Sequence, residues 1–385
     1  MPIRVGLIGC GNIAVGRHVP AYLAMPELVE IVAVADPTPE RRDAAAALLG
    51  LGPDDVHADP LELIGRADVT AVDVSTPPHV RTPIALAALR AGKPVLCEKP
   101  IATIPREAAE LVAEASTSGV ALGVVHNYLY FPEIVAARRI IESGEIGEPE
   151  VAILNFLGVD DRPGTEGYRP GWRHETRVAG GGVLMDMMHA MYVAEALLGR
   201  PIVRVSAHID ARESDATVES LALCRVETDG GTGLVNVGWG VGPGGLAVSG
   251  TAGRLDIRYE NGDTSPFAPL ESISVVDRDG ARRQEPVFVD PAEGSPAVFV
   301  TAALRDFFTR LAEGRPPRAT GLDGAHVLQA VIAAYGSAAT GRTVPLPLSD
   351  DAPTFLRGVA GVAELDGPSW SPIIRRGLFG TPTNH

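Results

Sequence analysis

Residues 5–14, VGLIGCGNIA, decide the fold of the first half of the chain. The apolar run at their start predicts a short strand buried on both faces. It leads into Gly9, Gly11 and Ala14 in the spacing G-x-G-x-x-A. Gly9 permits a tight turn, Gly11 removes the Cβ where a pyrophosphate would approach, and Ala14 lets the next helix pack closely. Because that helix presents unpaired N–H groups at its start, the stretch predicts a dinucleotide-binding turn.

A carboxylate about 20 residues after the glycines completes this pattern. Residues 29–36, VEIVAVAD, predict a second buried strand that ends at Asp36. An acidic side chain at this position accepts hydrogen bonds from a ribose 2′-OH and repels a 2′-phosphate. NAD is therefore the expected cofactor. Arg41 and Arg42, one turn into the next helix, keep NADP possible.

Length, charge and cysteine usage bound the class of protein. A chain of 385 residues exceeds what one hydrophobic core usually supports, so two domains are expected. A net charge of −15 without a basic run argues against nucleic acid as a partner. The three widely separated cysteines fit a reducing compartment. Without a signal peptide or an apolar run of about 18 residues, we expect a cytoplasmic protein that does not bind membranes.

The order of predicted elements changes near His126. Before it, strands alternate with helices, which predicts a doubly wound parallel sheet of the Rossmann type. After it, strands with period-two alternation predict a largely antiparallel open sheet with helices on one face. The clearest is 202–210, where Val203, Val205, Ala207 and Ile209 fall on one side. The expected fold class is thus α/β followed by α+β.

The expected divisions are 1–125 for cofactor binding, 126–348 for substrate binding and oligomerisation, and 349–385 for an irregular tail. In the second division we expect one helix over about 183–198 and a hairpin that pairs 274–276 with 287–289. Helices over about 297–313 and 321–340 are expected to cover a face of the second sheet. The aromatic residues Phe355, Trp370 and Phe379 suggest a docked tail. An open sheet face carrying Val and Leu predicts a homodimer or homotetramer.

The triplet Glu98-Lys99-Pro100 is the first candidate for chemistry. It follows a predicted strand, so Lys99 would lie at the carboxyl edge where doubly wound sheets bind ligands. A solvated surface lysine is the alternative interpretation. At this edge the ammonium group can instead hold a substrate hydroxyl or lower the pKa of a neighbouring acid.

Asp186 and His189 form the second candidate, after the triple glycine 180–182. Three residues apart on a helix, they would share a face, so the carboxylate could orient the imidazole. The neighbouring methionines leave open a core histidine bonded to a backbone carbonyl. Three successive glycines cost backbone entropy, which suggests that the chain approaches something closely there.

Weaker candidates are Thr76, His79, the run His126-Asn127-Tyr128 and the pair Trp172-Arg173. For Trp172, a packing role is the alternative interpretation. No cysteine and histidine spacing resembles a zinc site, and no nucleophile elbow is present, so no metal is expected.

With these residues in view, the chain resembles the Gfo/Idh/MocA family of oxidoreductases, over about residues 3–347. The likeness rests on VGLIGCGNIA with His18, VADPTPERR, STPPH, GKPVLCEKP, VVHNYLYFPE, SGEIGE, GWR, GGGVLMDMMH and AAYGSAATGRTVPLP. It implies an N-terminal Rossmann domain, a C-terminal open sheet that often forms the subunit interface, and NAD(P)-dependent redox chemistry at a sugar or cyclitol hydroxyl.

The resemblance and the motifs together assign three sets of residues. The catalytic set is Lys99, His189 and Asp186, and the substrate-binding set adds Tyr128 to these three. The cofactor-binding set is Gly9, Gly11, Asn12, Ile13, Asp36, Ser75, Thr76, Pro77, His79, Glu98, Lys99, Asn127, Trp172 and Arg173. The family usually has four residues from the Asp to the His, whereas here the step is three. Counting back from Leu198-Gly199 keeps His189 in place, so Asp186 is the displaced member.

The leading hypothesis is an NAD-dependent dehydrogenase of a sugar, cyclitol or related polyhydroxylated ring. His189 would take the hydroxyl proton, Lys99 would polarise the oxygen, and Asp186 would set the charge and tautomer of the imidazole. One alternative is a glycosidase that retains NAD and acts by transient oxidation and elimination. The other is a regulator that binds NAD and sugar without turnover.

Overall fold

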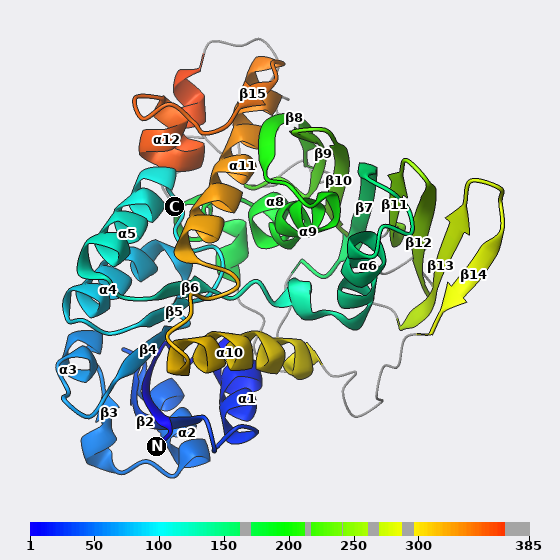
Figure 1. The fold of residues 1–385 in the computed structure, drawn as a ribbon. Coiled ribbons are helices and arrows are strands. Elements are labelled where there is room, and N and C mark those ends of the chain that lie inside the picture. The colour runs from blue at the N-terminus through cyan, green and yellow to red at the C-terminus, as the bar shows by residue number, and fades with distance from the viewer. Residues whose placement is uncertain (162–170, 212–216, 241, 261–268, 287–295, 366–385) are drawn as a thin grey trace. The chain divides into compact units, whose positions relative to one another are not determined.

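The computed structural model describes residues 1–161, 171–211, 217–240, 242–260, 269–286 and 296–365. Internal contacts divide the chain into two compact units, each built on its own sheet (Figure 1). Unit 1 comprises Met1–Thr103, Glu107–Tyr130 and Asp290–Ala325. Unit 2 comprises Ile104–Arg106, Phe131–Val289 and His326–His385. The three-part functional division expected from the sequence stays a prediction.

Unit 1 is organised on a six-stranded parallel sheet with the order β3-β2-β1-β4-β5-β6. The central strand β1 pairs with β2 on one side and β4 on the other. The strand order therefore reverses beside the glycine turn that follows β1, the position at which such sheets bind ligands. This confirms the predicted Rossmann sheet. The strands are β1 (Ile3–Ile8), β2 (Val29–Ala35), β3 (Val56–His57), β4 (Ala71–Val74), β5 (Val95–Cys97) and β6 (Leu122–Val124).

Helices connect these strands, and their ends follow the expected local signals. α2 begins at Pro39, whose ring fits the first helical turn, and ends at Gly50, which has a φ of 69°. The helix after the glycine turn contains a π-helical segment, η1, before it continues as α1. The helical elements are η1 (Ala14–His18), α1 (Val19–Leu23), α2 (Pro39–Leu49), η2 (Pro53–Asp55), α3 (Pro60–Ile64), α4 (Pro78–Arg90), α5 (Pro105–Ser118) and η3 (Asn127–Tyr130).

α10 (Pro296–Ala312) also belongs to unit 1, although it follows the second sheet in sequence. Leu304, Phe307 and Phe308 are buried in the same apolar core as Leu7. The Phe308 ring lies 5.7 Å from that of Tyr22, in an edge-to-face arrangement. The expectation that this helix covers the second sheet is therefore wrong. Its amphipathic pattern shows an apolar face but not which sheet that face meets.

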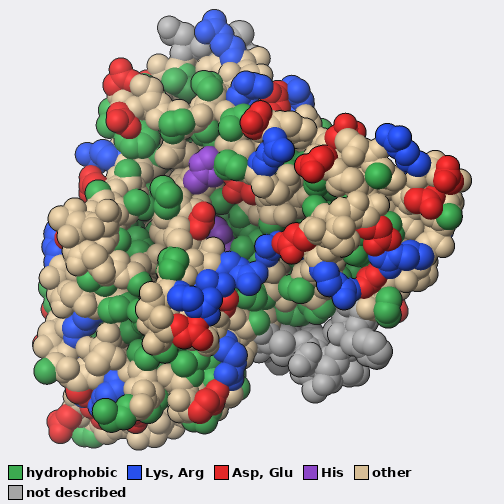
Figure 2. Space-filling view, in the orientation of Figure 1, with side chains coloured by type: hydrophobic (Ala, Val, Ile, Leu, Met, Phe, Trp, Pro, Cys, Tyr) green, Lys and Arg blue, Asp and Glu red, His purple; other side chains and the backbone are tan. Residues whose placement is uncertain are grey.

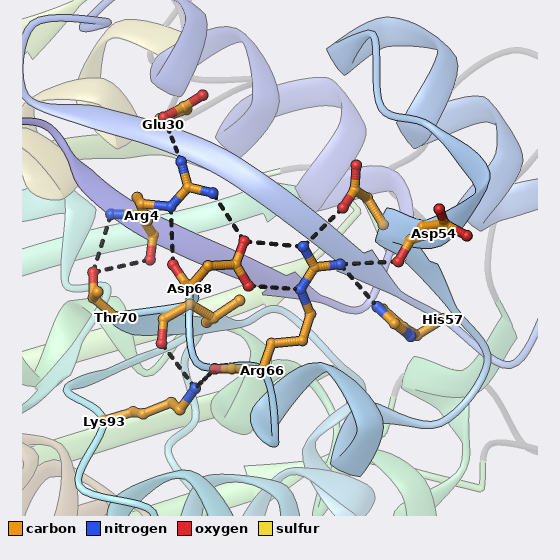
Figure 3. Close-up of polar contacts among 10 residues, drawn as sticks. Arg4, Glu30, Asp54, His57, Arg66, Asp68, Thr70 and Lys93 are labelled. Carbon is orange, nitrogen blue, oxygen red and sulfur yellow. Dashed lines mark hydrogen bonds and ion pairs between the residues drawn. The ribbon is translucent and has the colours of Figure 1, made fainter.

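A cluster of ion pairs joins the amino ends of strands β1 and β4 in unit 1 (Figure 3). Asp68 accepts from Arg66 Nη2 at 3.0 Å and from Arg4 Nη2 at 2.8 Å. These hydrogen bonds hold the pKa of Asp68 well below its usual range. Lys93 Nζ donates to the carbonyl oxygen of Val69 at 2.8 Å. The cluster thus fastens the sheet at the edge opposite the glycine turn.

Unit 2 is organised on a nine-stranded sheet with the order β14-β13-β12-β11-β7-β10-β9-β8-β15. Every strand pairing is antiparallel except that between β7 and β10, which is parallel. The largely antiparallel second sheet is therefore confirmed. Its strands are β7 (Pro149–Val159), β8 (Ile202–Asp210), β9 (Leu221–Thr228), β10 (Thr232–Trp239), β11 (Gly244–Gly250), β12 (Gly253–Tyr259), β13 (Leu270–Asp277), β14 (Arg282–Glu285) and β15 (Val344–Pro345).

Alternation along these strands separates a covered face from an open one. In β10, Val235 and Val237 are buried while Leu234 is 39% exposed. A Cβ built on Gly233 would lie 3.7 Å from Ala194, so the covered face meets α9 (His189–Leu198). The other helical elements of unit 2 are α6 (Pro132–Glu142), η4 (Gly171–His174), α7 (Thr176–Ala179), α8 (Val183–Asp186), α11 (Gly321–Thr340), α12 (Pro353–Arg357) and η5 (Gly358–Glu364); α11 begins in unit 1.

Two local expectations in unit 2 are corrected. The helix expected over 183–198 is two helices, because Met187 leaves the helical conformation with φ −96° and ψ 27°. Asp186 therefore ends α8, and His189 begins α9. The hairpin turn at Asp279-Gly280 is present, but β13 pairs with Arg282–Glu285. Residues 287–289, expected as its partner, lie outside the described residues.

The beginning of the tail is folded. Phe355 on α12 is 8% exposed, which fits the expected docking, whereas Trp370 and Phe379 lie outside the described residues. Figure 2 shows acidic and basic side chains interspersed over the visible face. Within the part of the chain that the structure describes, none of the helices combines the length and apolarity needed to cross a membrane.

Candidate active site

The structure explains the two glycines of the turn after β1 in different ways. Gly9 has a φ of 91°, and a Cβ there would lie 2.9 Å from the backbone of Ser75 and Thr76. The close approach of the loop after β4 therefore excludes a side chain at residue 9. A Cβ on Gly11 would meet nothing within 4 Å. No packing within the described chain requires this glycine, whereas the approach of a ligand backbone or pyrophosphate would.

Asp36 fixes the shape of the same turn. Its Oδ2 accepts the Cys10 N–H at 2.8 Å, and its Oδ1 accepts the Thr38 N–H at 2.8 Å. Arg42 Nη1 donates to the Asp36 carbonyl oxygen at 3.2 Å. Burial, together with the charge of Asp36, raises the pKa of the Cys10 thiol to about 12. The carboxylate thus has a clear structural role, and its hydrogen bond to a ribose stays a prediction.

The surroundings of this turn fit the dinucleotide expected from the sequence. Thr76 is 8% exposed, and its Oγ1 has no hydrogen-bond partner among the residues that the structure describes. Ile13 is 38% exposed, and His79 and Pro77 at the start of α4 are exposed. Open space at Gly11 and an unsatisfied hydroxyl on the neighbouring loop are what a bound polar ligand would use.

The E-K-P turn lies at the carboxyl end of β5, as the sequence predicts. Lys99 is half-buried, and its backbone N–H donates to Glu98 Oε2 at 2.9 Å. The Lys99–Pro100 peptide is cis. Asn127 and Tyr128, both half-buried, lie in η3 after the neighbouring strand β6. The structure therefore brings Lys99, Asn127 and Tyr128 to one edge of the unit 1 sheet.

In unit 2 the structure pairs Asp186 with Arg173. Arg173 Nε donates to Asp186 Oδ1 at 3.0 Å, and its guanidinium lies 4.8 Å from the centre of the Trp172 ring. Both side chains of the ion pair are largely shielded, with 19% and 11% exposed. Arg173, assigned to the cofactor, thus contacts both Trp172 and the proposed catalytic acid.

The imidazole of His189 is paired with Tyr192, three residues along α9. His189 Nδ1 lies 2.5 Å from the Tyr192 hydroxyl, and the two rings meet edge to face. His189 is 5% exposed. Tyr192 is thus a hydrogen-bond partner of the ring that was not expected from the sequence, and the orientation of the imidazole by Asp186 stays a prediction.

The triple glycine has an explanation within the chain itself. A Cβ on Gly181 would lie 2.2 Å from the Tyr335 hydroxyl, and one on Gly182 would lie 2.3 Å from the Glu219 carbonyl oxygen. Glu219 is fully buried and accepts N–H groups of Gly182 and Leu184 at 2.9 Å through its carboxylate. The close approach inferred from these glycines is therefore real, but the neighbours are Glu219 and Tyr335.

This carboxylate holds the start of α8. Tyr335 donates its hydroxyl proton to Glu219 Oε1 at 2.6 Å. Burial raises the pKa of Glu219 to about 6, although these hydrogen bonds partly offset the effect of burial. Glu219 and Tyr335 thereby fix the helix whose last residue is Asp186. Neither residue could be predicted from the sequence, because their partners lie 35 and 153 residues away.

Two family models match successive stretches of this chain. The model of the Gfo/Idh/MocA oxidoreductase family with an NAD-binding Rossmann fold matches residues 3–126. The model of the Gfo/Idh/MocA C-terminal domain matches residues 134–256. The chain belongs to the Gfo/Idh/MocA family of oxidoreductases.

Two relatives match this family member over nearly their whole length. Inositol 2-dehydrogenase 2 of Saccharopolyspora erythraea is 31% identical over 360 residues, which cover 91% of this chain and 97% of the relative. The 1,5-anhydro-D-fructose reductase of Ensifer adhaerens is 32% identical over 357 residues, covering 89% and 98%. The resemblance inferred from the motifs is confirmed, and this Gfo/Idh/MocA member is an oxidoreductase with an NAD-binding domain.

Solved structures of the family agree with the fold. A levoglucosan dehydrogenase in complex with NADH and L-sorbose superposes with a TM-score of 0.77 and 25% identity, over 91% of this chain and all of that chain. Aldose-aldose oxidoreductase from Caulobacter crescentus superposes with a TM-score of 0.76 at 24% identity, over 90% of this chain and all of that chain. The second comparison bears on the fold alone.

The amino-acid composition gives a further indication that Lys99 is functional. Of its 33 Lys and Arg residues, only Lys93 and Lys99 are lysines. Lys93 has a structural role, because its Nζ is bonded to two backbone carbonyl oxygens. A protein that uses arginine at all its other basic positions keeps a lysine at the E-K-P turn. Among the described residues, no group of three His, Cys, Asp or Glu side chains is placed to hold a metal ion.

Proposed function

We propose that this oxidoreductase is an NAD-dependent dehydrogenase that oxidises a hydroxyl of a sugar, cyclitol or related polyhydroxylated ring. The observation that carries the proposal is Lys99, one of two lysines in the chain, at the carboxyl edge of the Rossmann sheet. An ammonium group offers three donors to a hydroxyl or carbonyl oxygen and can change its charge state, which a guanidinium cannot. The names of the relatives, which include an inositol dehydrogenase and an anhydrofructose reductase, support a polyhydroxylated substrate.

The proposed chemistry assigns a separate role to each candidate residue. Lys99 binds the substrate oxygen and stabilises negative charge that develops on it. When Nδ1 of His189 donates to Tyr192, Nε2 carries the lone pair that accepts the hydroxyl proton. NAD, when bound, supplies the hydride acceptor. Arg173 orients Asp186 and keeps it ionised, and the carboxylate raises the pKa of His189.

The binding assignments extend these roles. Gly9, Gly11, Asn12, Ile13 and Asp36, with the loop from Ser75 to His79, would hold the dinucleotide, and Asn127, Trp172 and Arg173 would complete its site. Tyr128 would bind the substrate beside Lys99. NAD is the proposed physiological cofactor, and the cytoplasm is the proposed location.

The open face of the second sheet is the proposed subunit interface. Leu223 and Leu234 are each 39% exposed, and Val151 is 37% exposed. They lie on adjacent strands β9, β10 and β7, on the side away from α9. Apolar side chains gathered in this way mark interaction surfaces, so we propose a homodimer or homotetramer built through this face.

The test is a panel of polyols and glycosides incubated with NAD or NADP, in which both NADH and organic product are followed. NADH formed together with an oxidised polyol is the expected result. Release of a glycoside's aglycone without net NADH would instead select the NAD-retaining glycosidase. Binding of panel compounds without turnover would select the non-catalytic regulator. The matched variant is Lys99→Arg, which keeps the charge and should lose most of the turnover.

A further inference from the structure

Four charged side chains are buried together beneath the E-K-P turn of unit 1. They are His18 and Asp73, each 0% exposed, Arg81 at 2% and Glu98 at 6%. Removing charged groups from water is costly even when they are paired. A protein with apolar residues of the same size at these positions would often be at least as stable. The cluster is therefore poor evidence for stability and invites a functional explanation.

Arg81 holds the backbone on both sides of Lys99. From α4, its Nη1 donates to the carbonyl oxygen of Glu98 at 2.7 Å and also to that of Pro100. Its Nη2 donates to the carbonyl oxygen of Thr76. One planar guanidinium thus ties the residues before and after Lys99 to the loop that follows β4, which approaches Gly9.

Glu98 holds the N–H of Lys99 and links it to the first helix. Its Oε2 accepts the Lys99 N–H at 2.9 Å, and its Oε1 lies 3.1 Å from His18 Nε2. His18 Nδ1 lies 2.7 Å from Asp73 Oδ2, which also accepts the Tyr22 hydroxyl at 2.6 Å. Burial would lower the pKa of His18, but the two carboxylates outweigh it and raise the pKa to about 10. The imidazole therefore stays charged and donates at both ends.

We propose that Arg81 and the chain Glu98–His18–Asp73 are positioning residues that fix the Lys99 backbone to the cofactor loops. The inference rests on the proposed function, in which Lys99 binds the substrate oxygen. It assigns to these residues no contact with substrate. Their effect is to limit the positions that the Lys99 ammonium can take, which counts because a misplacement of about 1 Å can cost a hundredfold in rate.

The rarity of lysine gives a direct measurement on the protein alone. With ¹³C,¹⁵N-labelled lysine, the wild type should give only two lysine side-chain signals, and Lys99→Arg assigns them. Arg81→Lys keeps the charge but cannot reproduce the planar contact with three carbonyl groups. It should shift or broaden the Lys99 signal and leave that of Lys93 in place. The matched control, Arg90→Lys, changes an exposed residue of the same helix. Each of these two variants adds one lysine and therefore a third signal, and the control should leave the signals of Lys93 and Lys99 unchanged.

The second measurement is steady-state kinetics with the polyol of the panel that gives the highest rate of NADH formation. Arg81→Lys should lower kcat by about tenfold to a hundredfold. In a Lys99→Ala background the same change should alter kcat less than twofold, because residues that act as a unit are not additive. If circular dichroism shows that Arg81→Lys does not fold, Glu98→Gln replaces it. The glutamine amide has only one acceptor oxygen, so its N–H₂ group would face the donor of either Lys99 or His18.

The outcomes separate the two proposals. An unmoved Lys99 signal, or an equal loss of kcat with and without Lys99, would overturn the positioning role and leave only a structural one. A normal rate in Lys99→Ala would overturn the role of the lysine in the proposed function. The spectra do not depend on any substrate, so they decide the positioning of Lys99 even if the panel yields no NADH.

Discussion

Replacing Glu219 by glutamine should change how the stability of unit 2 depends on pH. The carboxylate is fully buried and receives N–H groups of Gly182 and Leu184 and the hydroxyl of Tyr335. Burial raises its pKa from the usual 4.5 to about 6. Below pH 4.5 the group is protonated in both the folded and the unfolded chain. Between pH 4.5 and 6 the unfolded chain ionises first, so the folded state loses stability as the pH rises.

The size of this loss follows from the shift in pKa. A difference of about 1.5 pKa units corresponds to about 2 kcal/mol in the free energy of unfolding. Glutamine does not titrate, so the variant lacks this part of the pH dependence, whatever constant offset its altered hydrogen bonds introduce. Relative to Glu219→Gln, the wild type should therefore lose about 2 kcal/mol between pH 4.5 and 7.

Urea unfolding of dilute protein, followed by tryptophan fluorescence at several pH values, measures the difference. The three tryptophans, at positions 172, 239 and 370, fall outside the ranges of unit 1, so their fluorescence does not report on it. Trp239 donates its backbone N–H to the carbonyl of Ser220, the neighbour of Glu219. Tyr335→Phe removes a hydrogen bond that lowers the pKa of Glu219, so its loss should be larger than that of the wild type. Parallel pH curves for wild type and Glu219→Gln would refute the reasoning.

Four further outcomes are expected. His189→Ala should lower kcat by about 10² to 10⁴ with little change in NAD affinity measured by titration, and an unaltered kcat would remove it as the base. Asp186→Asn should lower kcat and shift the acidic limb of its pH profile toward lower pH, because the base must be unprotonated and the loss of a nearby negative charge lowers a histidine pKa; an unchanged profile and rate would exclude the acid. Steady-state kinetics should give a higher kcat/KM with NAD than with NADP, since Asp36 repels a 2′-phosphate, and the reverse preference would contradict this. Light scattering at micromolar concentration should show a dimer or tetramer that Leu234→Glu dissociates; a wild-type monomer would contradict the interface.

The sequence predicted the features that depend on short stretches of chain. The strand β1, the turn with Gly9 and Gly11, and the carboxylate of Asp36 are encoded within about 30 residues. The helix α2 begins at the expected Pro39 and is followed by the expected Gly50. Period-two alternation likewise located β8 at Ile202–Asp210. These signals act locally, so they can be interpreted without knowing the tertiary contacts.

What the sequence did not reveal depends on distant partners. His18 meets Asp73 and Glu98 across 55 and 80 residues, and no spacing rule connects them. The break at Met187 was hidden because the apolar pattern continues through it. The triple glycine did signal a close approach, but only the structure shows that the neighbours are Glu219 and Tyr335.

The return of α10 to unit 1 constrains how this protein can be made. A Cβ on Gly123 would lie 2.6 Å from the Phe307 ring, so β6 is shaped to receive a helix from nearly two hundred residues downstream. During synthesis on a ribosome, the dinucleotide-binding half cannot close its core until that helix emerges. A fragment that ends at residue 126 would lack Phe308 and would expose to solvent the surface of Tyr22 against which that ring packs. The cofactor half of this enzyme is therefore not a module that can be transplanted by its sequence boundaries alone.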